Sequence, residues 1–411
     1  MIAMLSVSQA EATILNLIQP LNPQDIETVD LLTASGRILA KPIISQLDFP
    51  HWDNSAMDGY AVRYQDVQHT TPDQPTILEI VEEIPAGHQP QSTIHSGQAA
   101  RIFTGAIIPP GADTIVIQEK TQREANQVTI LAAPQPQEFI RHRASYYQAG
   151  SPLLPAGIEL NAPEIAVLAA AQCHKLSVYR KPRVAIFSTG DELVTPEQKL
   201  QPGQIVDSNN YALHTLIIQS GAEPLMLGIV KDNPEALTRA IAQAITTADI
   251  IISSGGVSVG DYDYVEQILT TLGAEIHIRA VAIKPGKPLT VATFPQLYFG
   301  LPGNPVSALV TFWRFVQPAI AKLSGITSGW EPQFIKARSL SELRSDGKRE
   351  TYLWGQLHLV DGTYEFQLAG GSNSSGNLIN LAQTNALGIL RVDQTRINRG
   401  EEVLVLKRGG R

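Results

Sequence analysis

The pattern of apolar and polar positions is most regular between about residues 181 and 325. Short apolar runs alternate there with helical patterns; the strand candidates are 184–187, 225–230 and 249–252, and the helix candidates are 210–220 and 234–246. Strands that alternate with helices predict a mostly parallel sheet with helices on both faces, which is a three-layer α/β domain. Ligands of such sheets gather at the carboxyl ends of the strands, so the loops after the apolar runs are the first candidates for a site.

The flanking regions have the pattern of β-structure. Residues 49–145 are rich in Pro, Gly, Thr and Val and contain short alternating runs, which predicts a small β domain. Residues 146–180 contain a helical stretch that we expect to pack on the first region, so that the β domain is an insertion. Short strands return near the C-terminus. The predicted domains are 1–48 plus 146–180, 49–145, 181–328 and 329–411.

The N-terminal segment predicts a helix, a proline-rich break and a second helix. Ala10, Ile14 and Ile18 recur on one helix face, and Ser8 and Glu11 have the spacing of a capping box. The first 19 residues carry no Lys or Arg and no long apolar core, which is unlike a signal peptide. No stretch approaches the roughly 18 apolar residues of a membrane span. The expected location is the cytoplasm, with no membrane partner.

Composition excludes several classes of protein. The chain has 43% hydrophobic and 17% charged residues, which argues against disorder. Its formal net charge of −8 argues against a broad nucleic-acid-binding surface, although a local basic pocket stays compatible with it. The single cysteine, Cys173, excludes an intrachain disulfide framework and a multi-cysteine zinc site. The nine histidines include no HExxH spacing.

The loop after the apolar run 249–252 is rich in glycine and serine and precedes a helical pattern. Glycines allow a ligand to approach the backbone, and amides at a helix N-terminus favour phosphate. Carboxylate oxygens are the ligands that Mg²⁺ prefers. A tight turn with an aspartate as N-cap explains this loop equally well when it is taken alone. Its candidate binding residues are Gly255, Gly256 and Ser258, and its candidate metal ligands are Asp261 and Asp263.

The loop after the run 184–187 reads Ser188, Thr189, Gly190, Asp191 and Glu192. Two adjacent carboxylates at a strand end suit a metal ligand or a base. The alternative is that the aspartate caps a turn and the glutamate is a solvated acid, and the two interpretations are evenly balanced.

Two proline-restrained loops complete this edge of the predicted sheet. Lys284 and Lys287 supply fixed positive charge, which suits a phosphate, whereas two solvated lysines on a surface turn are the ordinary alternative. The last loop precedes a helix predicted over 306–323, so it is either a second oxyanion site or only a helix start. Its residues are Pro302, Gly303, Asn304 and Pro305.

Two further segments lie outside the α/β region. Residues 50–62 mix polar, small and aromatic residues around Asp58 without the period of a strand or a helix. Thr104 lies in a Phe-Thr-Gly-Ala segment shortly before a Pro-Pro-Gly turn. Ordinary β-turns are the alternative for both segments.

Taken together and in this order, the motifs resemble the molybdopterin molybdenumtransferase family, which includes the gephyrin E domain. The resemblance extends over essentially the whole chain. The matching motifs are Ser-Ala-Met-Asp-Gly-Tyr-Ala at 55–61, Thr-Gly-Ala at 104–106, Ser-Thr-Gly-Asp-Glu-Leu at 188–193, Gly-Gly-Val-Ser-Val-Gly at 255–260, Lys-Pro-Gly-Lys-Pro at 284–288 and Leu-Pro-Gly-Asn-Pro-Val-Ser at 301–307.

The resemblance implies a fold and a reaction. The fold has an elongated first domain, an inserted β domain, a central α/β domain of the molybdopterin-binding type and a C-terminal β-barrel. The reaction inserts molybdate into adenylylated molybdopterin with Mg²⁺ and releases AMP, and both of these molecules are substrates. The implied assembly is a homodimer whose cleft lies between the central domain of one subunit and the N-terminal domains of the other. A molybdopterin adenylyltransferase is a further expected partner.

The resemblance also implies residue roles. Lys284 and Lys287 would neutralise phosphate or molybdate charge, and Asp58 and Thr104 would close the cleft from the partner subunit. The expected catalytic residues are Asp58, Thr104, Glu192, Asp263, Lys284 and Lys287. The expected binding residues are Ser188, Thr189, Gly190, Gly255, Gly256, Ser258, Pro302, Gly303, Asn304 and Pro305. The expected Mg²⁺ ligands are Asp191, Glu192, Asp232, Asp261 and Asp263.

One departure from the family pattern concerns Tyr146, which stands where many members have an acidic residue. A phenol cannot ligate Mg²⁺ as a carboxylate does at neutral pH. Two alternatives therefore stand beside the molybdenum transfer. One is a catalytically weak scaffold of the gephyrin E-domain type, and the other is a molybdopterin adenylyltransferase.

Overall fold

The computed structural model describes residues 4–256, 264–371 and 374–408. The chain divides into two compact units, each with its own sheets and apolar cores. Unit 1 contains Met1–Lys41, Ala156–Ala169 and Cys173–Arg411, and unit 2 contains Pro42–Pro155 and Ala170–Gln172.

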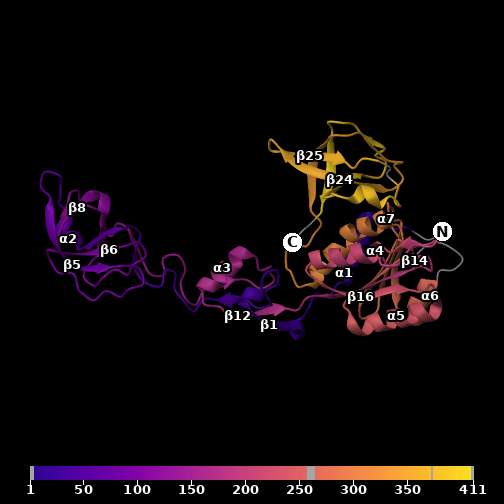
Figure 1. The fold of residues 1–411 in the computed structure, drawn as a ribbon, viewed down its shortest axis with the longest axis horizontal. Helices are drawn as coiled ribbons and strands as arrows, with labels where there is room; N and C mark the ends of the chain where they lie inside the picture. Colours follow the sequence, from indigo (N-terminus) through magenta and orange to yellow (C-terminus); the bar gives the residue numbers. More distant parts are fainter. Residues whose placement is uncertain (1–3, 257–263, 372–373, 409–411) are drawn as a thin grey trace. The chain divides into compact units, whose positions relative to one another are not determined.

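A six-stranded sheet forms the centre of unit 1 (Figure 1). The strand order is β16-β13-β17-β21-β20-β18, and the first four strands run parallel. This confirms the mostly parallel sheet predicted from the sequence. The strands are β13 (Arg183–Thr189), β16 (Glu223–Val230), β17 (Ile250–Ser254), β18 (Glu275–Ala280), β20 (Pro288–Thr293) and β21 (Leu297–Leu301).

Helices cover both faces of this sheet. Successive side chains of a strand point to opposite faces, so Ile186 of β13 lies in one apolar cluster and Phe187 in the other. The first cluster includes residues of α1 (Val7–Leu17), α4 (Asn209–Gln219), α7 (Pro305–Thr311) and α8 (Gln317–Leu323). The second includes residues of α5 (Pro234–Thr247) and α6 (Tyr264–Thr271), and Figure 1 shows α4 and α5 on opposite sides. The domain therefore has the three layers that the sequence predicts.

The helix predicted over 306–323 contains a π-helical turn. Phe312–Val316 forms this turn between α7 and α8. π-Helical turns are rare and occur mostly as single turns inside α-helices. Arg314 lies in the turn with only 5% of its side chain exposed and forms an ion pair with Glu11 of α1.

The N-terminal capping prediction was wrong in its register. Helix α1 is capped by Ser6, whose side chain accepts a hydrogen bond from Gln9 N while Gln9 Oε1 accepts one from Ser6 N. Ser8 and Glu11 therefore do not form a capping box. The second predicted helix is replaced by the 3₁₀ turns Pro23–Asp25 and Leu31–Thr33 and by strand β1 (Ile26–Asp30).

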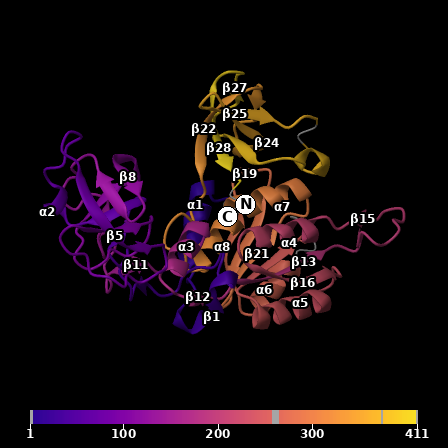
Figure 2. The same ribbon diagram turned by 60° about the vertical axis from the view of Figure 1, so that its left-hand side comes forward.

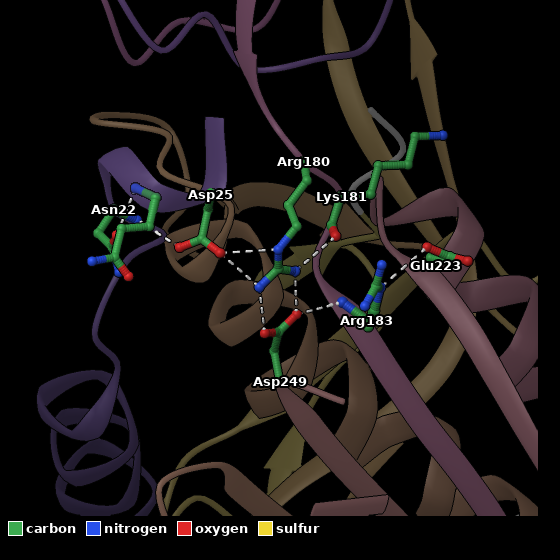
Figure 3. Close-up of polar contacts among 8 residues, drawn as sticks. Asn22, Asp25, Arg180, Lys181, Arg183, Glu223 and Asp249 are labelled. Carbon is green, nitrogen blue, oxygen red and sulfur yellow. Dashed lines mark hydrogen bonds and ion pairs between the residues drawn. The ribbon is translucent and has the colours of Figure 1, made fainter. Parts of the chain in front are cut away.

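The rest of the N-terminal part of unit 1 pairs with a segment far along the chain. Strand β1 pairs antiparallel with β12 (Lys175–Tyr179), and helix α3 spans Ala162–Ala170. Arg180 follows β12 and links this part to the central sheet (Figure 3). Its Nη1 and Nη2 donate to the two carboxylate oxygens of Asp249, each at 2.7 Å, and its Nε donates to Asp25 Oδ1 at 3.0 Å. The forked guanidinium thus holds two carboxylates from different elements.

Replacing Arg180 with glutamine is expected to lower the free energy of unfolding by about 2–3 kcal/mol, because two partly buried carboxylates lose their counter-ion. The matched control is Arg183→Gln: its guanidinium lies 3.8 Å from Glu223 and is 53% exposed. That change should cost less than about 1 kcal/mol. Urea unfolding measures both values, and equal losses would contradict the role given to Arg180.

The C-terminal part of unit 1 is a closed five-stranded barrel (Figure 2). Pairings run from β24 through β25, β22, β28 and β26 and return from β26 to β24. This confirms the predicted C-terminal β-barrel. Its strands are β22 (Phe334–Ser339), β24 (Glu350–Val360), β25 (Thr363–Leu368), β26 (Ala386–Leu390) and β28 (Glu402–Lys407). Elsewhere in unit 1, β14 (Leu193–Val194) pairs with β15 (Ile205–Val206). The other short strands are β19 (Ile283–Lys284), which pairs with β24, and β23 (Leu343–Arg344) with β27 (Arg396–Ile397).

Unit 2 contains a six-stranded sheet in the order β7-β4-β6-β5-β9-β8. Apolar clusters lie on its two faces, one around Tyr60 and one around Ala61. The inserted β domain is therefore confirmed, whereas the four domain boundaries stay predictions. The sheet strands are β4 (Gly59–Val62), β5 (Thr76–Ile84), β6 (Gln98–Ile102), β7 (Thr114–Ile117), β8 (Thr121–Glu124) and β9 (Gln127–Ile130). The other elements are β2 (Ile43–Ile44), β3 (Asn54–Ser55), β10 (Ile140–Arg141), β11 (Pro152–Leu154) and α2 (Tyr64–Val67).

No helix in the described part of the chain is long and apolar enough to cross a membrane.

Candidate functional site

Four loops follow the parallel strands of the central sheet and meet at one edge of it. Because β13, β16, β17 and β21 run in the same direction, their carboxyl ends share this edge. The loops begin with Gly190, Lys231, Gly255 and Pro302. We call them together the loop edge.

Hydrogen bonds join the first two loops of the loop edge. Thr189 Oγ1 donates to Asp232 Oδ1 at 3.3 Å, and Asp232 N donates to Asp191 Oδ1 at 3.3 Å. The carboxylate of Glu192 lies beside Gly190, since a Cβ on that glycine would be 2.7 Å from Glu192 Oε2. The structure therefore brings the predicted residues Thr189, Asp191, Glu192 and Asp232 together.

The glycine loop packs closely on its neighbours. Gly255 has φ +92°, and a Cβ there would lie 2.4 Å from the carbonyl oxygen of Thr189. A Cβ on Gly256 would lie 2.8 Å from Thr189 Cγ2, and one on Gly303 would lie 3.5 Å from Gly255 Cα. Gly255 N donates to Leu301 O at 3.2 Å. Three of the loops thus pack backbone against backbone, which explains why glycine is required at 255.

The two predicted lysines differ in their surroundings. Lys284 Nζ donates to Asp346 Oδ2 at 3.0 Å, and this hydrogen bond lowers the pKa of the Asp346 carboxyl. Lys287 is exposed, and its ammonium meets no carboxylate within the described ranges. The positive charge of Lys284 is partly offset by Asp346, whereas the charge of Lys287 is available to an anionic ligand.

The fourth loop contacts the C-terminal part of unit 1. Asn304 Nδ2 donates to Ser375 Oγ at 3.2 Å, and Val306 N donates to Ser375 O at 3.3 Å. Pro302 O accepts a hydrogen bond from Ser254 Oγ at 3.4 Å, and Pro305 is the first residue of α7. Asn304 makes no side-chain cap to α7, so its amide is used between domains and not within the helix.

Three predicted residues, Ser258, Asp261 and Asp263, lie outside the described residues. Among the residues that are described, no group of three or more His, Cys, Asp or Glu side chains is arranged to hold a metal ion. The Asp191 carboxylate nevertheless accepts from the backbone N–H of Asp232, and the Asp232 carboxylate accepts from Thr189, so the first two loops each present hard oxygen donors of the kind that suits Mg²⁺. The donor chemistry thus fits the ion, and the full ligand set stays a prediction.

Unit 2 brings Asp58 and Thr104 together. Thr104 donates to Asp58 Oδ1 from both its hydroxyl, at 2.7 Å, and its backbone N–H, at 2.8 Å. These two hydrogen bonds, aided by the charge of Arg101, lower the pKa of Asp58. The carboxylate is therefore ionised throughout the neutral pH range.

The segment that carries Tyr146 is held by an ion pair and by backbone hydrogen bonds. Arg143 N donates to Asp53 Oδ1 at 2.7 Å, and Arg143 Nε donates to Asp48 Oδ2 at 2.6 Å. Tyr146 is 69% exposed, and its backbone N–H donates to Phe49 O at 2.9 Å. The phenol thus lies on the surface of unit 2, where it is accessible to a partner or a ligand.

Sequence reasoning missed four polar residues that contact predicted site residues, and a fifth, Asn210, that bonds to one of the four. Ser188 Oγ donates to Asp207 Oδ1 at 3.0 Å, so a buried aspartate just before α4 supports the end of β13 and the loop that follows it. Three of these residues lie at or just before the start of α4, and two lie in the C-terminal part of unit 1. The polar Asp-Ser-Asn-Asn run at 207–210 is a sequence signal for the first three, and no such signal marks the other two. The five are Asp207, Asn209, Asn210, Asp346 and Ser375.

Family models match three successive regions of the chain. A model described as the MoeA N-terminal region (domain I and II) matches residues 5–171. A model described as a probable molybdopterin binding domain matches residues 185–322, and one described as the MoeA C-terminal region (domain IV) matches residues 336–407. Together with the loop edge, these matches define a multidomain protein with a molybdopterin-binding type of α/β domain.

Similarity to individual proteins specifies the family within this class. The chain is 66% identical to a molybdopterin molybdenumtransferase of a Nostoc species over 98% of this chain and 93% of the relative. It is 36% identical to a molybdopterin molybdenumtransferase of Haemophilus influenzae over 98% of each chain. The chain belongs to the molybdopterin molybdenumtransferase family.

A solved structure supports the fold over the same length. The crystal structure of the molybdopterin biosynthesis MoeA protein from Pyrococcus horikoshii matches with a TM-score of 0.85 and 27% identity. The match covers 98% of this chain and 100% of that one. The two β domains and the central α/β domain are thus shared with a protein of the same family.

Proposed function

We propose that the protein is a molybdopterin molybdenumtransferase, which transfers molybdenum from molybdate to adenylylated molybdopterin and releases AMP. The observation that carries the proposal is 66% identity, over 98% of the chain, to a relative with that name. The matches to both MoeA flanking regions favour this reaction over adenylylation of molybdopterin. An adenylyltransferase that supplies the substrate and a cytoplasmic location are parts of the same proposal.

The loop edge is suited to a substrate with several negative charges. The backbones at Gly255 and Gly303 lie close together, and Lys287, which immediately precedes β20, carries a positive charge that meets no carboxylate within the described part of unit 1. Preorganised donors and cations of this kind stabilise phosphate and the charge that develops on a leaving group. We assign phosphate and molybdate binding to Lys284 and Lys287, and pterin-side or nucleotide binding to the other predicted loop residues.

A second copy of the chain completes the proposed site. Thr104 donates two hydrogen bonds to Asp58, which keep its carboxylate ionised. The loop edge carries carboxylates of its own, at Asp191 and Asp232. We infer that Asp58 and Thr104 approach the substrate from the partner subunit of a homodimer, where Asp58 accepts a proton or a hydrogen bond from the reacting group. No covalent protein intermediate is part of the proposal.

We assign Mg²⁺ to Asp191, Glu192 and Asp232, together with Asp261 and Asp263. The ion would supply charge neutralisation between these carboxylates and the anionic substrate. The residues of this chain orient the ligands. Thr189 orients Asp232, and Asp232 N orients Asp191, so the two carboxylates are fixed before substrate binds.

The test of the proposed function is AMP release. Purified protein is incubated with adenylylated molybdopterin, with and without molybdate, and with Mg²⁺ or with EDTA. We expect AMP release that requires both molybdate and the divalent ion. An absence of molybdate-dependent AMP release would reject the proposed reaction, and activity that persists in EDTA would reject the metal assignment alone.

Lys287→Ala is expected to raise the KM for adenylylated molybdopterin about tenfold at low salt, because one exposed cation that faces a polyanion is lost. The difference from wild type should shrink at high ionic strength, since salt screens the interaction. Lys199→Ala, which removes another exposed lysine, is the matched control and should leave KM unchanged. A KM for Lys287→Ala that equals that of the wild type at low salt would exclude the phosphate role.

The exposed position of Tyr146 favours one second candidate, a scaffold with weak catalysis. Tyr146→Phe separates the two functions, because it removes the hydroxyl and keeps the ring. Molybdenum transfer at the wild-type rate by this variant would show that the departure from the family pattern does not limit catalysis. AMP release that stays near background in the wild type and in a Tyr146→Asp variant would favour the scaffold.

A further inference from the structure

The start of helix α4 bonds to two strands that carry the loop edge. Asp207 and Asn210 are 3% and 2% exposed. Asp207 Oδ1 accepts from Ser188 Oγ of β13, and Asp207 Oδ2 accepts from Asn210 Nδ2 at 2.6 Å. Asn210 Nδ2 also donates to Gly228 O of β16 at 3.1 Å. These bonds fix the helix start against the β13–β16 side of the sheet.

Asn209 bonds to strand β17 and to the loop that follows β21. Its side-chain nitrogen Nδ2 donates to Ser254 Oγ of β17 at 2.7 Å and to Gly303 O, in the loop after β21, at 2.8 Å. The residue is 7% exposed. Ser254 immediately precedes Gly255, so one amide group joins the glycine loop to the Pro302–Pro305 loop.

We propose that Asn209 is a positioning residue for the proposed reaction: it sets the spacing of the glycine loop and the Pro302–Pro305 loop, to which the proposed function assigns substrate binding. The inference rests on the proposed function. The two N–H groups of one planar amide point in fixed directions, so Ser254 and Gly303 cannot move apart without losing a buried hydrogen bond. A shift of about 1 Å in a binding group is enough to lower kcat/KM strongly.

The variant Asn209→Asp tests this role with little change in shape. At neutral pH the introduced carboxylate has no N–H to donate, so Gly303 O loses its partner. We expect the KM for adenylylated molybdopterin to rise about tenfold, the equivalent of one lost hydrogen bond, while kcat stays within about threefold. As the pH is lowered, the introduced group protonates and can donate again, so the ratio of variant to wild-type KM should fall.

Ser220→Ala is the matched control at the other end of the same helix. Ser220 is 2% exposed, and its Oγ donates to Leu216 O at 2.7 Å, so the change also removes a buried hydrogen bond but not one to a loop. It should lower the thermal unfolding temperature and leave KM unchanged. If Asn209→Asp behaves in the same way, with a lower unfolding temperature and an unchanged KM, Asn209 is only structural and the inference is overturned. A wild-type protein without AMP release would overturn the proposed function and this inference together.

Discussion

Replacing Arg314 with methionine is expected to lower the free energy of unfolding by about 3–5 kcal/mol, because it removes one partner of a buried ion pair and leaves the other charge unpaired. Its Nη1 and Nη2 donate to the two carboxylate oxygens of Glu11 at 2.5 and 2.8 Å, and its Nε donates to Tyr352 Oη at 3.0 Å. The three residues belong to the π-helical turn, to α1 and to β24, so one guanidinium joins three parts of unit 1. Urea unfolding of the purified variant measures the loss.

Two further variants separate the ion pair from the loss of a side chain. Lys336→Met removes a cation that is 73% exposed and 2.8 Å from Glu402, and it should cost less than about 1 kcal/mol. The double variant Glu11→Leu with Arg314→Met removes both charges, so it should recover much of the loss. Equal costs for Arg314→Met and Lys336→Met would contradict the account of the π-helical turn.

Gly255→Ala is expected to lower kcat/KM for molybdenum transfer about 100-fold while the protein stays folded, because a shift of about 1 Å in a binding loop can cost that much. The added Cβ would lie 2.4 Å from the carbonyl oxygen of Thr189, and backbone cannot rotate away as a flexible side chain can. The glycine loop and the Thr189 loop must therefore separate. Steady-state AMP release measures the effect.

Gly203→Ala is the control for backbone strain. Gly203 has φ +87°, close to the +92° of Gly255, but a Cβ there would meet nothing within 4 Å. Both variants place an alanine in the left-handed region, and only Gly255→Ala also meets a neighbouring loop. A similar loss of kcat/KM in the two variants would show that strain, and not the loop contact, is responsible.

The sequence predicted those features that depend on local pattern. Apolar runs followed by glycine, proline and charged residues predicted that Asp191, Gly255 and Gly303 lie at strand ends, and the parallel sheet places their loops at one edge. The same reasoning could not find Asn209 or Ser375. Their contacts depend on how distant segments pack, and their residue types are also ordinary at helix starts and turns.

The errors at the N-terminus have a physical cause. Two overlapping capping signals occur there, and the helix uses Ser6 with Gln9 in preference to Ser8 with Glu11. Glu11 instead forms an ion pair with Arg314, which lies in the π-helical turn 303 residues further along the chain. A tertiary ion pair therefore competes with a local cap, and local spacing alone does not reveal which of the two is formed.

The most direct test of the central claim is the number of molybdenum atoms transferred for each AMP released. Purified protein is incubated with adenylylated molybdopterin, molybdate and Mg²⁺, and pterin-bound molybdenum and free AMP are measured in the same sample. The proposed function predicts one molybdenum atom in the pterin product for each AMP. In the Gly255→Ala variant, the amounts of both products should fall in the same proportion. AMP without pterin-bound molybdenum would contradict it, because the protein would then be only a hydrolase of the adenylylated substrate.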